Sequence, residues 1–187
     1  MKFDPIVAQM ELQTWMWRIG KLRKMNPGIN MPETADEWLL RHGKPMNERL
    51  LLPERLVHPK SKQCYLNAYS LFRRRKNLHY CEGNVYMDDC PIPVMHGWCV
   101  NDQGLVLDPS VGNDCGIVYF GVQYQDAFVR ECWVDLKYHQ AIGILPNVFL
   151  FGKKDDGWMD KGVCNQLQIV GKGIDIRWEA DIVESGD

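Results

Sequence analysis

Apolar positions in the first part of the chain repeat with helical spacing in two places. Residues 5–25 carry apolar side chains three and four positions apart, in a broad stripe rich in Met and Trp. A second helix is predicted from Thr34, which forms a capping-box pattern with Glu37, to about Gly43. We therefore predict a helical N-terminal lobe over residues 1–60. Its first helix is expected to pack over the core, with contact to a partner protein as the alternative.

A third helix is predicted to begin at Ser61 and to end in a run of basic residues. The Ser61 hydroxyl is a good acceptor for a free backbone N–H of the first turn. If Ser61 is the N-cap, Cys64 is the third helical residue. A thiol at that place lies in the partial positive charge of the helix N-terminus, which favours the thiolate.

From residue 79 onward the sequence takes on the aromatic and β-branched composition of strands. The sequence has no internal repeat and no linker, so residues 1–187 are interpreted as one α+β domain with an antiparallel sheet, in which residues 61–187 form the core. Strands are predicted at 79–86, 94–100, 105–109, 117–122, 147–152, 166–171 and 174–178, a helix at 123–139 and a polar loop at 153–157.

The segment around Asn101 predicts a hairpin and its register. If Asp102-Gln103-Gly104 is a three-residue loop, Asn101 faces Leu105 and facing residue numbers sum to about 206. His96 and Asp108 then lie on one face of the sheet, one diagonal step apart, within reach of a side-chain hydrogen bond. A four-residue loop would place them on opposite faces.

Cys64, His96 and Asp108 together match the needs of nucleophilic catalysis. A thiol nucleophile needs a base within hydrogen-bond reach, and the base needs a third group that fixes its tautomer. Each residue also has a structural interpretation: a core cysteine, a strand histidine with satisfied hydrogen bonds, and an Asp-Pro turn. The hypothesis of a catalytic site depends on the three occurring together in this order.

Residues 63–122 resemble small papain-like cysteine hydrolases that overlap with the transglutaminase-like and NlpC/P60-like groups, including uncharacterised phage and bacterial members. The resemblance implies a papain-like core, a catalytic Cys64, a base His96 and an orienting Asp108. One departure is Gly97, where alanine is more usual between the His and the Trp. The motifs that carry the resemblance are Gln63-Cys64-Tyr65-Leu66-Asn67-Ala68, Tyr80-Cys81-Glu82-Gly83, His96-Gly97-Trp98, Val106-Leu107-Asp108-Pro109-Ser110 and Tyr119-Phe120-Gly121-Val122.

Four further residues are candidates for the cleft. Gln63, which neighbours the nucleophile, is the first candidate for an oxyanion donor, and Asn67, one helical turn on, is the second. Glu82 either lines the cleft or caps the polar side of the sheet. Trp98 is expected to pack beside the His–Asp pair, as core or as substrate platform.

Composition narrows the class of protein. A charge of −2 over 187 residues gives no argument for nucleic-acid or membrane binding, and no apolar run reaches the roughly 18 residues that span a bilayer. Seven cysteines without an export signal favour a reducing compartment, so we expect the cytoplasm of a bacterium or of a phage host. The cysteines form no Cys-x-x-Cys pair and no phosphate-binding glycine motif is present, so we expect neither metal nor cofactor.

The leading hypothesis is a cysteine hydrolase that cleaves a peptide, isopeptide or other amide bond in a protein or peptide substrate, through a thioester on Cys64. A transglutaminase-like acyl transferase would use the same three residues with an amine acceptor. A catalytically silent phage-type protein that binds and inhibits a host factor is the third hypothesis, with helix 5–25 as its contact surface. The sequence leaves the oligomeric state open.

Overall fold

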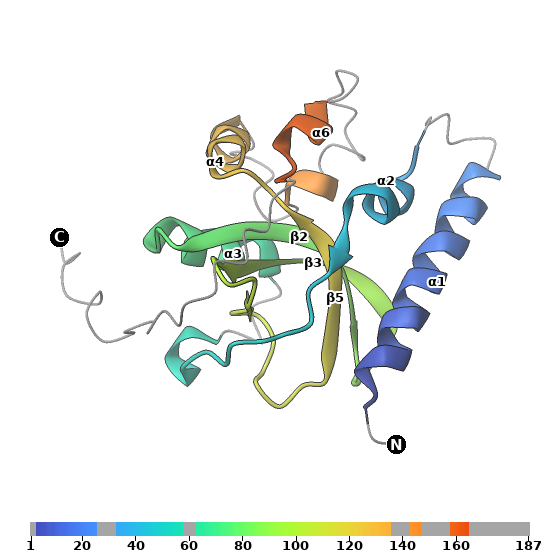
Figure 1. Ribbon diagram of the computed structural model, residues 1–187, viewed down its shortest axis with the longest axis horizontal. Coiled ribbons are helices and arrows are strands. Elements are labelled where there is room, and N and C mark those ends of the chain that lie inside the picture. Colours follow the sequence, from blue (N-terminus) through green and yellow to red (C-terminus); the bar gives the residue numbers. More distant parts are fainter. Residues whose placement is uncertain (1–2, 26–32, 58–62, 136–142, 147–157, 165–187) are drawn as a thin grey trace.

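A curled antiparallel sheet of five strands forms the centre of the protein, in the order β1-β5-β2-β3-β4, with helices packed on it (Figure 1). The computed structural model describes residues 3–25, 33–57, 63–135, 143–146 and 158–164. The strands are β1 (Lys44–Pro45), β2 (Leu78–Met87), β3 (Cys90–Asn101), β4 (Val106–Leu107) and β5 (Ile117–Gln123). The helices are α1 (Pro5–Lys24), α2 (Ala35–His42), η1 (Glu54–Leu56), α3 (Cys64–Arg74), α4 (Asp126–Asp135) and α6 (Trp158–Gly162).

The first two helices confirm the sequence prediction. The Asp4 side chain caps α1 by accepting hydrogen bonds from the backbone N–H groups of Ile6 and Val7. The capping box of Thr34 and Glu37 is present at the start of α2. The first 60 residues are not a helical lobe alone, because β1 lies between them and pairs with β5 as an edge strand.

The third helix begins later than predicted. Its N-cap is Gln63, which makes no side-chain capping bond, so Cys64 is the first helical residue rather than the third. Ser61, the predicted cap, lies outside the described residues. The shift keeps Cys64 among the first residues of the helix, whose backbone N–H groups have no partner within the helix.

The β2–β3 hairpin is longer than the predicted strands. Asp88 and Asp89 form its turn, and β3 begins at Cys90 rather than at the predicted residue 94, so that it includes the prolines at 91 and 93. Among the described residues only Cys99 and Val100 of β3 pair with β4, so the earlier part of β3 is a sheet edge. An edge position tolerates proline because its missing N–H would not serve a ladder there.

The predicted β3–β4 register is confirmed. Cys99 faces Leu107 and Val100 faces Val106, and both pairs sum to 206. Gly104 has a φ of 79°, the left-handed conformation that the loop requires. The strand after the loop is only Val106–Leu107, shorter than the predicted 105–109.

The structure confirms only some of the remaining predictions of strands and helices. Residues 117–122 are the strand β5, as predicted, but residue 123 still belongs to it, so the helix predicted at 123–139 begins only at Asp126. The predicted strands at 147–152, 166–171 and 174–178, and the loop at 153–157, lie outside the described residues.

Each face of the sheet carries its own core, because side chains alternate along a strand. The larger core lies between the sheet and helices α1 to α4, and it contains Cys99 of β3 and Phe120 of β5. The smaller core lies on the opposite face and contains Trp98 of β3 and Tyr119 of β5. Cys64 packs against the larger core, whereas His96 lies on the face of the smaller core, so the candidate site lies at the edge of β3 between the two faces.

Candidate active site

The hairpin brings His96 and Asp108 into direct contact. His96 Nε2 lies 2.8 Å from Asp108 Oδ2, and both side chains are buried. The contact follows from the β3–β4 register, which puts both residues on the face of the smaller core, one diagonal step apart. The contact predicted from the three-residue loop is therefore present in the structure.

Asp108 is held as a carboxylate by three donors. Besides His96, the Tyr119 hydroxyl donates to Oδ2 at 3.0 Å, and the Ser110 backbone N–H donates to Oδ1 at 2.8 Å. Burial by itself raises the pKa of Asp108, but the charge of His96 and these hydrogen bonds outweigh it and hold the pKa below its usual range.

The same contacts act on His96 in the opposite direction. Burial by itself lowers the pKa of His96, but the Asp108 carboxylate and hydrogen bonding to Asp108 and to Cys64 raise it to about 10. With Nε2 taken by Asp108, Nδ1 is the ring nitrogen left for the thiol. The imidazole is therefore oriented by Asp108, its pKa is also raised by the Cys64 thiol, and it holds a proton strongly.

Cys64 reaches this pair from the other face of the sheet. The helix α3 packs on β3 and β2 through the larger core, and Cys64, at its N-terminus, is partly buried. The Asn67 amide donates to Ser110 Oγ at 3.1 Å, which joins the first turn of α3 to the turn that follows Asp108. Cys99 Sγ donates to the carbonyl of Ala68 at 3.2 Å and joins the middle of the helix to β3.

Gly97 permits the close approach of helix and strand. A Cβ at position 97 would lie 2.9 Å from Cδ1 and 3.1 Å from Cα of Tyr65, the residue after Cys64. An ordinary carbon–carbon contact is about 3.5–4.0 Å. The glycine that departs from the usual His-Ala-Trp pattern is thus the residue against which α3 rests.

The four further candidates have different surroundings. Gln63 is exposed at the start of α3, and Asn67 is partly buried and bonded to Ser110. Glu82 and Trp98 are fully buried, so neither side chain faces solvent as the wall of a cleft would. The Trp98 ring stacks on His96 with centroids 6.3 Å apart, and Trp98 Nε1 has no hydrogen-bond partner among the described residues.

Sequence reasoning did not find the second partner of Asp108. Nothing local in the sequence indicates that the Tyr119 hydroxyl reaches Asp108, because Tyr119 lies on β5, outside the loop that fixes the register of His96 and Asp108. The hydrogen bond from the Ser110 N–H to Asp108 was predictable from the sequence, since an Asp side chain often accepts the N–H two residues ahead in an Asx turn.

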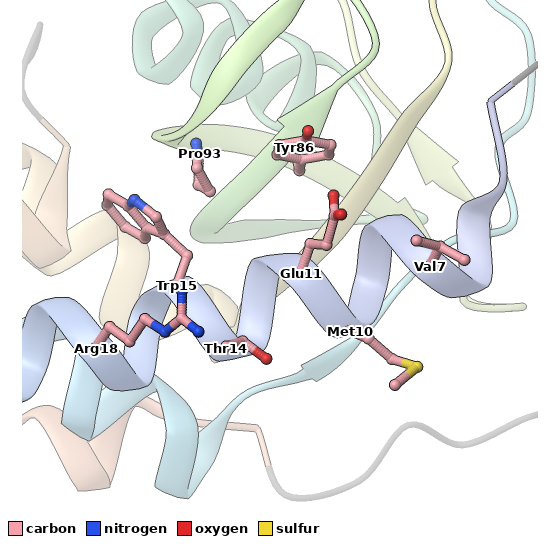
Figure 2. Close-up of a pocket in the computed structure, with 8 residues that line it drawn as sticks. All are labelled: Val7, Met10, Glu11, Thr14, Trp15, Arg18, Tyr86 and Pro93. Carbon is pink, nitrogen blue, oxygen red and sulfur yellow. The ribbon is translucent and has the colours of Figure 1, made fainter. Parts of the chain in front are cut away.

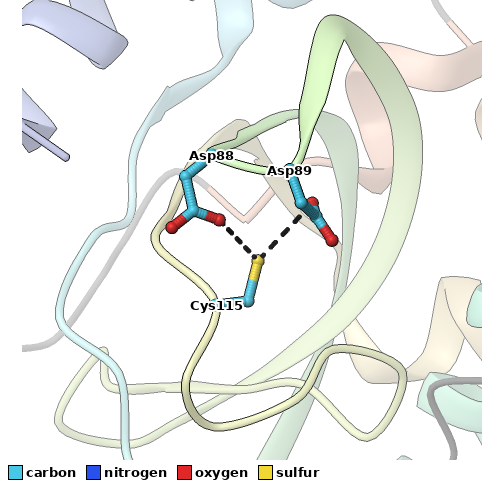
Figure 3. Close-up of side chains that lie close together, drawn as sticks. All are labelled: Asp88, Asp89 and Cys115. Atoms are coloured by element: carbon cyan, nitrogen blue, oxygen red, sulfur yellow. Dashed lines mark hydrogen bonds between the residues drawn. The ribbon is translucent and has the colours of Figure 1, made fainter. Parts of the chain in front are cut away.

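A second group of polar side chains lies at the turn end of the hairpin (Figure 3). The Cys115 thiol donates to Asp88 at 3.4 Å and to Asp89 at 3.8 Å. Burial and the two carboxylates raise the pKa of Cys115 to about 12, so the group is a protonated thiol held by two acceptors. These hydrogen bonds explain why the three side chains lie close together.

A cavity of about 570 Å³ is lined by residues of α1 and of the β2–β3 hairpin (Figure 2). This cavity is chemically different from the Cys64 site, because its lining contains neither Cys nor His. The lining residues are Val7, Met10, Glu11, Thr14, Trp15, Arg18, Tyr86 and Pro93.

Comparisons with protein-family models, with curated proteins and with solved structures give no significant match to this chain. No helix among the described residues has the length and apolar character needed to cross a membrane. The assignment of a function therefore depends on the geometry around Cys64, His96 and Asp108.

Proposed function

We propose that the protein is a cysteine hydrolase of papain-like arrangement that cleaves a peptide, isopeptide or other amide bond. The observation that carries the proposal is the position of His96, which is hydrogen-bonded to Asp108 at 2.8 Å and whose pKa, despite burial, is raised by Asp108 and, to a smaller extent, by the Cys64 thiol. This is the order of nucleophile, base and orienting group that thiol catalysis needs.

In the proposed reaction Cys64 is a thiolate paired with the His96 imidazolium, whose pKa is raised to about 10, and the thiolate attacks the carbonyl carbon of the amide. The charge that develops on the carbonyl oxygen is stabilised by the free backbone N–H of Cys64 at the N-terminus of α3. His96 then gives its proton to the leaving amine, and a thioester on Cys64 remains. Water adds to the thioester with His96 as base, which releases the acid and restores the thiol.

The other groups have supporting roles in this proposal. Tyr119 and the Ser110 N–H keep Asp108 ionised, and Trp98 shields the pair from water by stacking on His96. Gln63 is the exposed side chain nearest in sequence to the nucleophile and remains the candidate for a second oxyanion donor.

Thiol reactivity tests the proposal before any substrate is known. Iodoacetamide at pH 6.5 is expected to modify Cys64 at least about tenfold faster than Cys90, which is likewise partly exposed and serves as the internal control. His96→Ala should remove the preference, because the base that takes the thiol proton is lost. Equal modification of both cysteines, unchanged by His96→Ala, would contradict a catalytic role for Cys64.

Acylation gives a second, independent readout. With p-nitrophenyl acetate, the wild-type protein should release a burst of about one equivalent of p-nitrophenol as Cys64 is acylated. Cys64→Ala should abolish the burst. Decay of the acyl-enzyme in water supports a hydrolase, whereas decay only after addition of a primary amine would replace hydrolysis by acyl transfer.

The binding alternative has one specific observation in its favour. Large apolar side chains of α1 are exposed, among them Ile6 at 73%, Met10 at 65% and Trp17 at 57%, and Met10 also lines the 570 Å³ cavity. Exposed apolar groups of this kind are typical of surfaces that bind an apolar segment of another protein. A biological activity that survives Cys64→Ala and is lost on Met10→Lys would favour binding over hydrolysis.

A further inference from the structure

Glu82 is a buried carboxylate whose oxygens are fully occupied by protein donors. The Tyr80 hydroxyl donates to Oε1 at 2.6 Å, and the backbone N–H of Ile144 donates to the same oxygen at 2.7 Å. The backbone N–H of Leu145 donates to Oε2 at 2.6 Å. Glu82 thus joins β2 to a single helical turn at residues 144–146, which is distant in sequence.

The segment that Glu82 holds lies against the residue after the nucleophile. A Cβ at Gly143, whose φ is +82°, would lie 2.5 Å from Cδ1 of Tyr65 and 2.8 Å from Oε1 of Glu82. Tyr65 also meets Gly97, the neighbour of His96, through the same ring atom Cδ1 and through its Cα. Tyr65 therefore contacts both Gly143, beside the residues that Glu82 binds, and the strand that carries the base.

We propose that Glu82 is a positioning residue for Cys64, because its carboxylate fixes residues 143–146 against Tyr65 and so sets the place of Cys64 relative to His96. The inference rests on the proposed function, since it assigns a role in the reaction of Cys64. Glu82 does not touch the reacting atoms in this account, and it acts through Tyr65 alone.

The charge of Glu82 makes the role measurable. Burial raises the pKa of Glu82 to about 7 against the opposing effect of its three hydrogen bonds. The titratable groups that face it, the three tyrosines at 65, 80 and 124 and the thiol of Cys81, have pKa values raised well above their usual ranges by burial and stay neutral near pH 7.

Protonation of Glu82 removes the negative charge from an acceptor that receives three hydrogen bonds. The two bonds from the backbone N–H groups of Ile144 and Leu145 then lose their charge assistance and become roughly half as strong. The hold on residues 143–146 is complete only when Glu82 is ionised, so the positioning of Cys64 follows the ionisation of Glu82.

The test compares the alkylation rate of Cys64 by iodoacetamide in wild type and Glu82→Gln from pH 5.5 to 8.5. The glutamine presents an NH₂ group to one of the two backbone N–H donors and imitates the incomplete hold. We expect the wild-type to variant rate ratio to be near one at pH 5.5 and to rise to about tenfold at pH 8.5, since misplacement of reacting groups by about 1 Å costs about a hundredfold. Glu131→Gln, on the exposed side of α4, is the matched control and should give a ratio of one throughout.

Tyr80→Phe decides the question if Glu82→Gln fails to fold. It removes one of the donors that lower the pKa of Glu82, so the inflection in the Cys64 rate should move to higher pH than in wild type. A rate ratio that stays at one, or at a constant value independent of pH, overturns the inference, as does a Tyr80→Phe profile without a shift. Failure of the proposed function has a different signature: a wild-type Cys64 that reacts no faster than Cys90 at any pH, which overturns both.

Discussion

Replacement of Gly97 by alanine tests how closely α3 must approach β3. The added methyl group would lie 2.9 Å from Cδ1 and 3.1 Å from Cα of Tyr65. The Cα belongs to the helix backbone, so rotation of the side chain cannot relieve the contact. Restoring an ordinary separation of about 3.5 Å requires α3 to move away from β3 by about 0.5 Å.

Two costs follow from this displacement. Overpacking of a well-packed core destabilises proteins by about 1–3 kcal/mol, so we expect the free energy of unfolding of Gly97→Ala to fall by that amount. The N-terminus of α3 also carries Cys64 away from His96. Because about 1 Å of misplacement can cost about a hundredfold, half of that displacement should lower the rate of Cys64 alkylation by about tenfold.

Urea denaturation and iodoacetamide alkylation of Cys64 measure the two effects separately. Gly112→Ala is the matched control, because no heavy atom lies within 4 Å of a Cβ built there. If Gly97→Ala unfolds at the same urea concentration as Gly112→Ala and keeps the wild-type alkylation rate, α3 does not rest on Gly97 and the steric argument is refuted.

Two further predictions concern the half-buried ion pairs of His79 and the buried hydrogen bond from Tyr119 to Asp108. His79 lies between Asp102 at 2.9 Å and Asp126 at 3.1 Å, and although burial lowers its pKa, the two carboxylates raise it above its usual value of about 6.5. The stability that this pair contributes is therefore present below pH 6.5 and lost as the pH rises through the higher folded pKa. Because the groups are partly exposed, we expect this stability to be only about 0.2–1 kcal/mol. In urea denaturation at pH 6 the free energy of unfolding of wild type should exceed that of His79→Gln by this amount, and the difference should disappear at alkaline pH. A difference that is equal at both pH values would contradict the prediction. Tyr119→Phe removes one of three donors from buried Asp108, so the free energy of unfolding should fall by about 1–3 kcal/mol, and a variant as stable as wild type would show that the hydroxyl does not support the carboxylate.

The sequence by itself determined the relation of His96 to Asp108. The loop around Gly104 fixes the register of its two strands, because loop length and positive φ are local properties. Side-chain alternation then places both residues on one face without knowledge of any other element. The capping box at Thr34 was predictable for the same reason, since all its bonds lie within four residues.

Only the tertiary structure decided which distant elements meet at this site. Nothing in the sequence indicates that β5 brings the Tyr119 hydroxyl to Asp108, or that Glu82 receives the N–H groups of residues 144 and 145. The position of Cys64 within α3 also depended on the tertiary structure. Where a helix begins is set by its packing, here against β3, as well as by the presence of a capping residue. Contacts within one hairpin are set by local geometry, whereas contacts between faces of the sheet are set by the packing of the whole core.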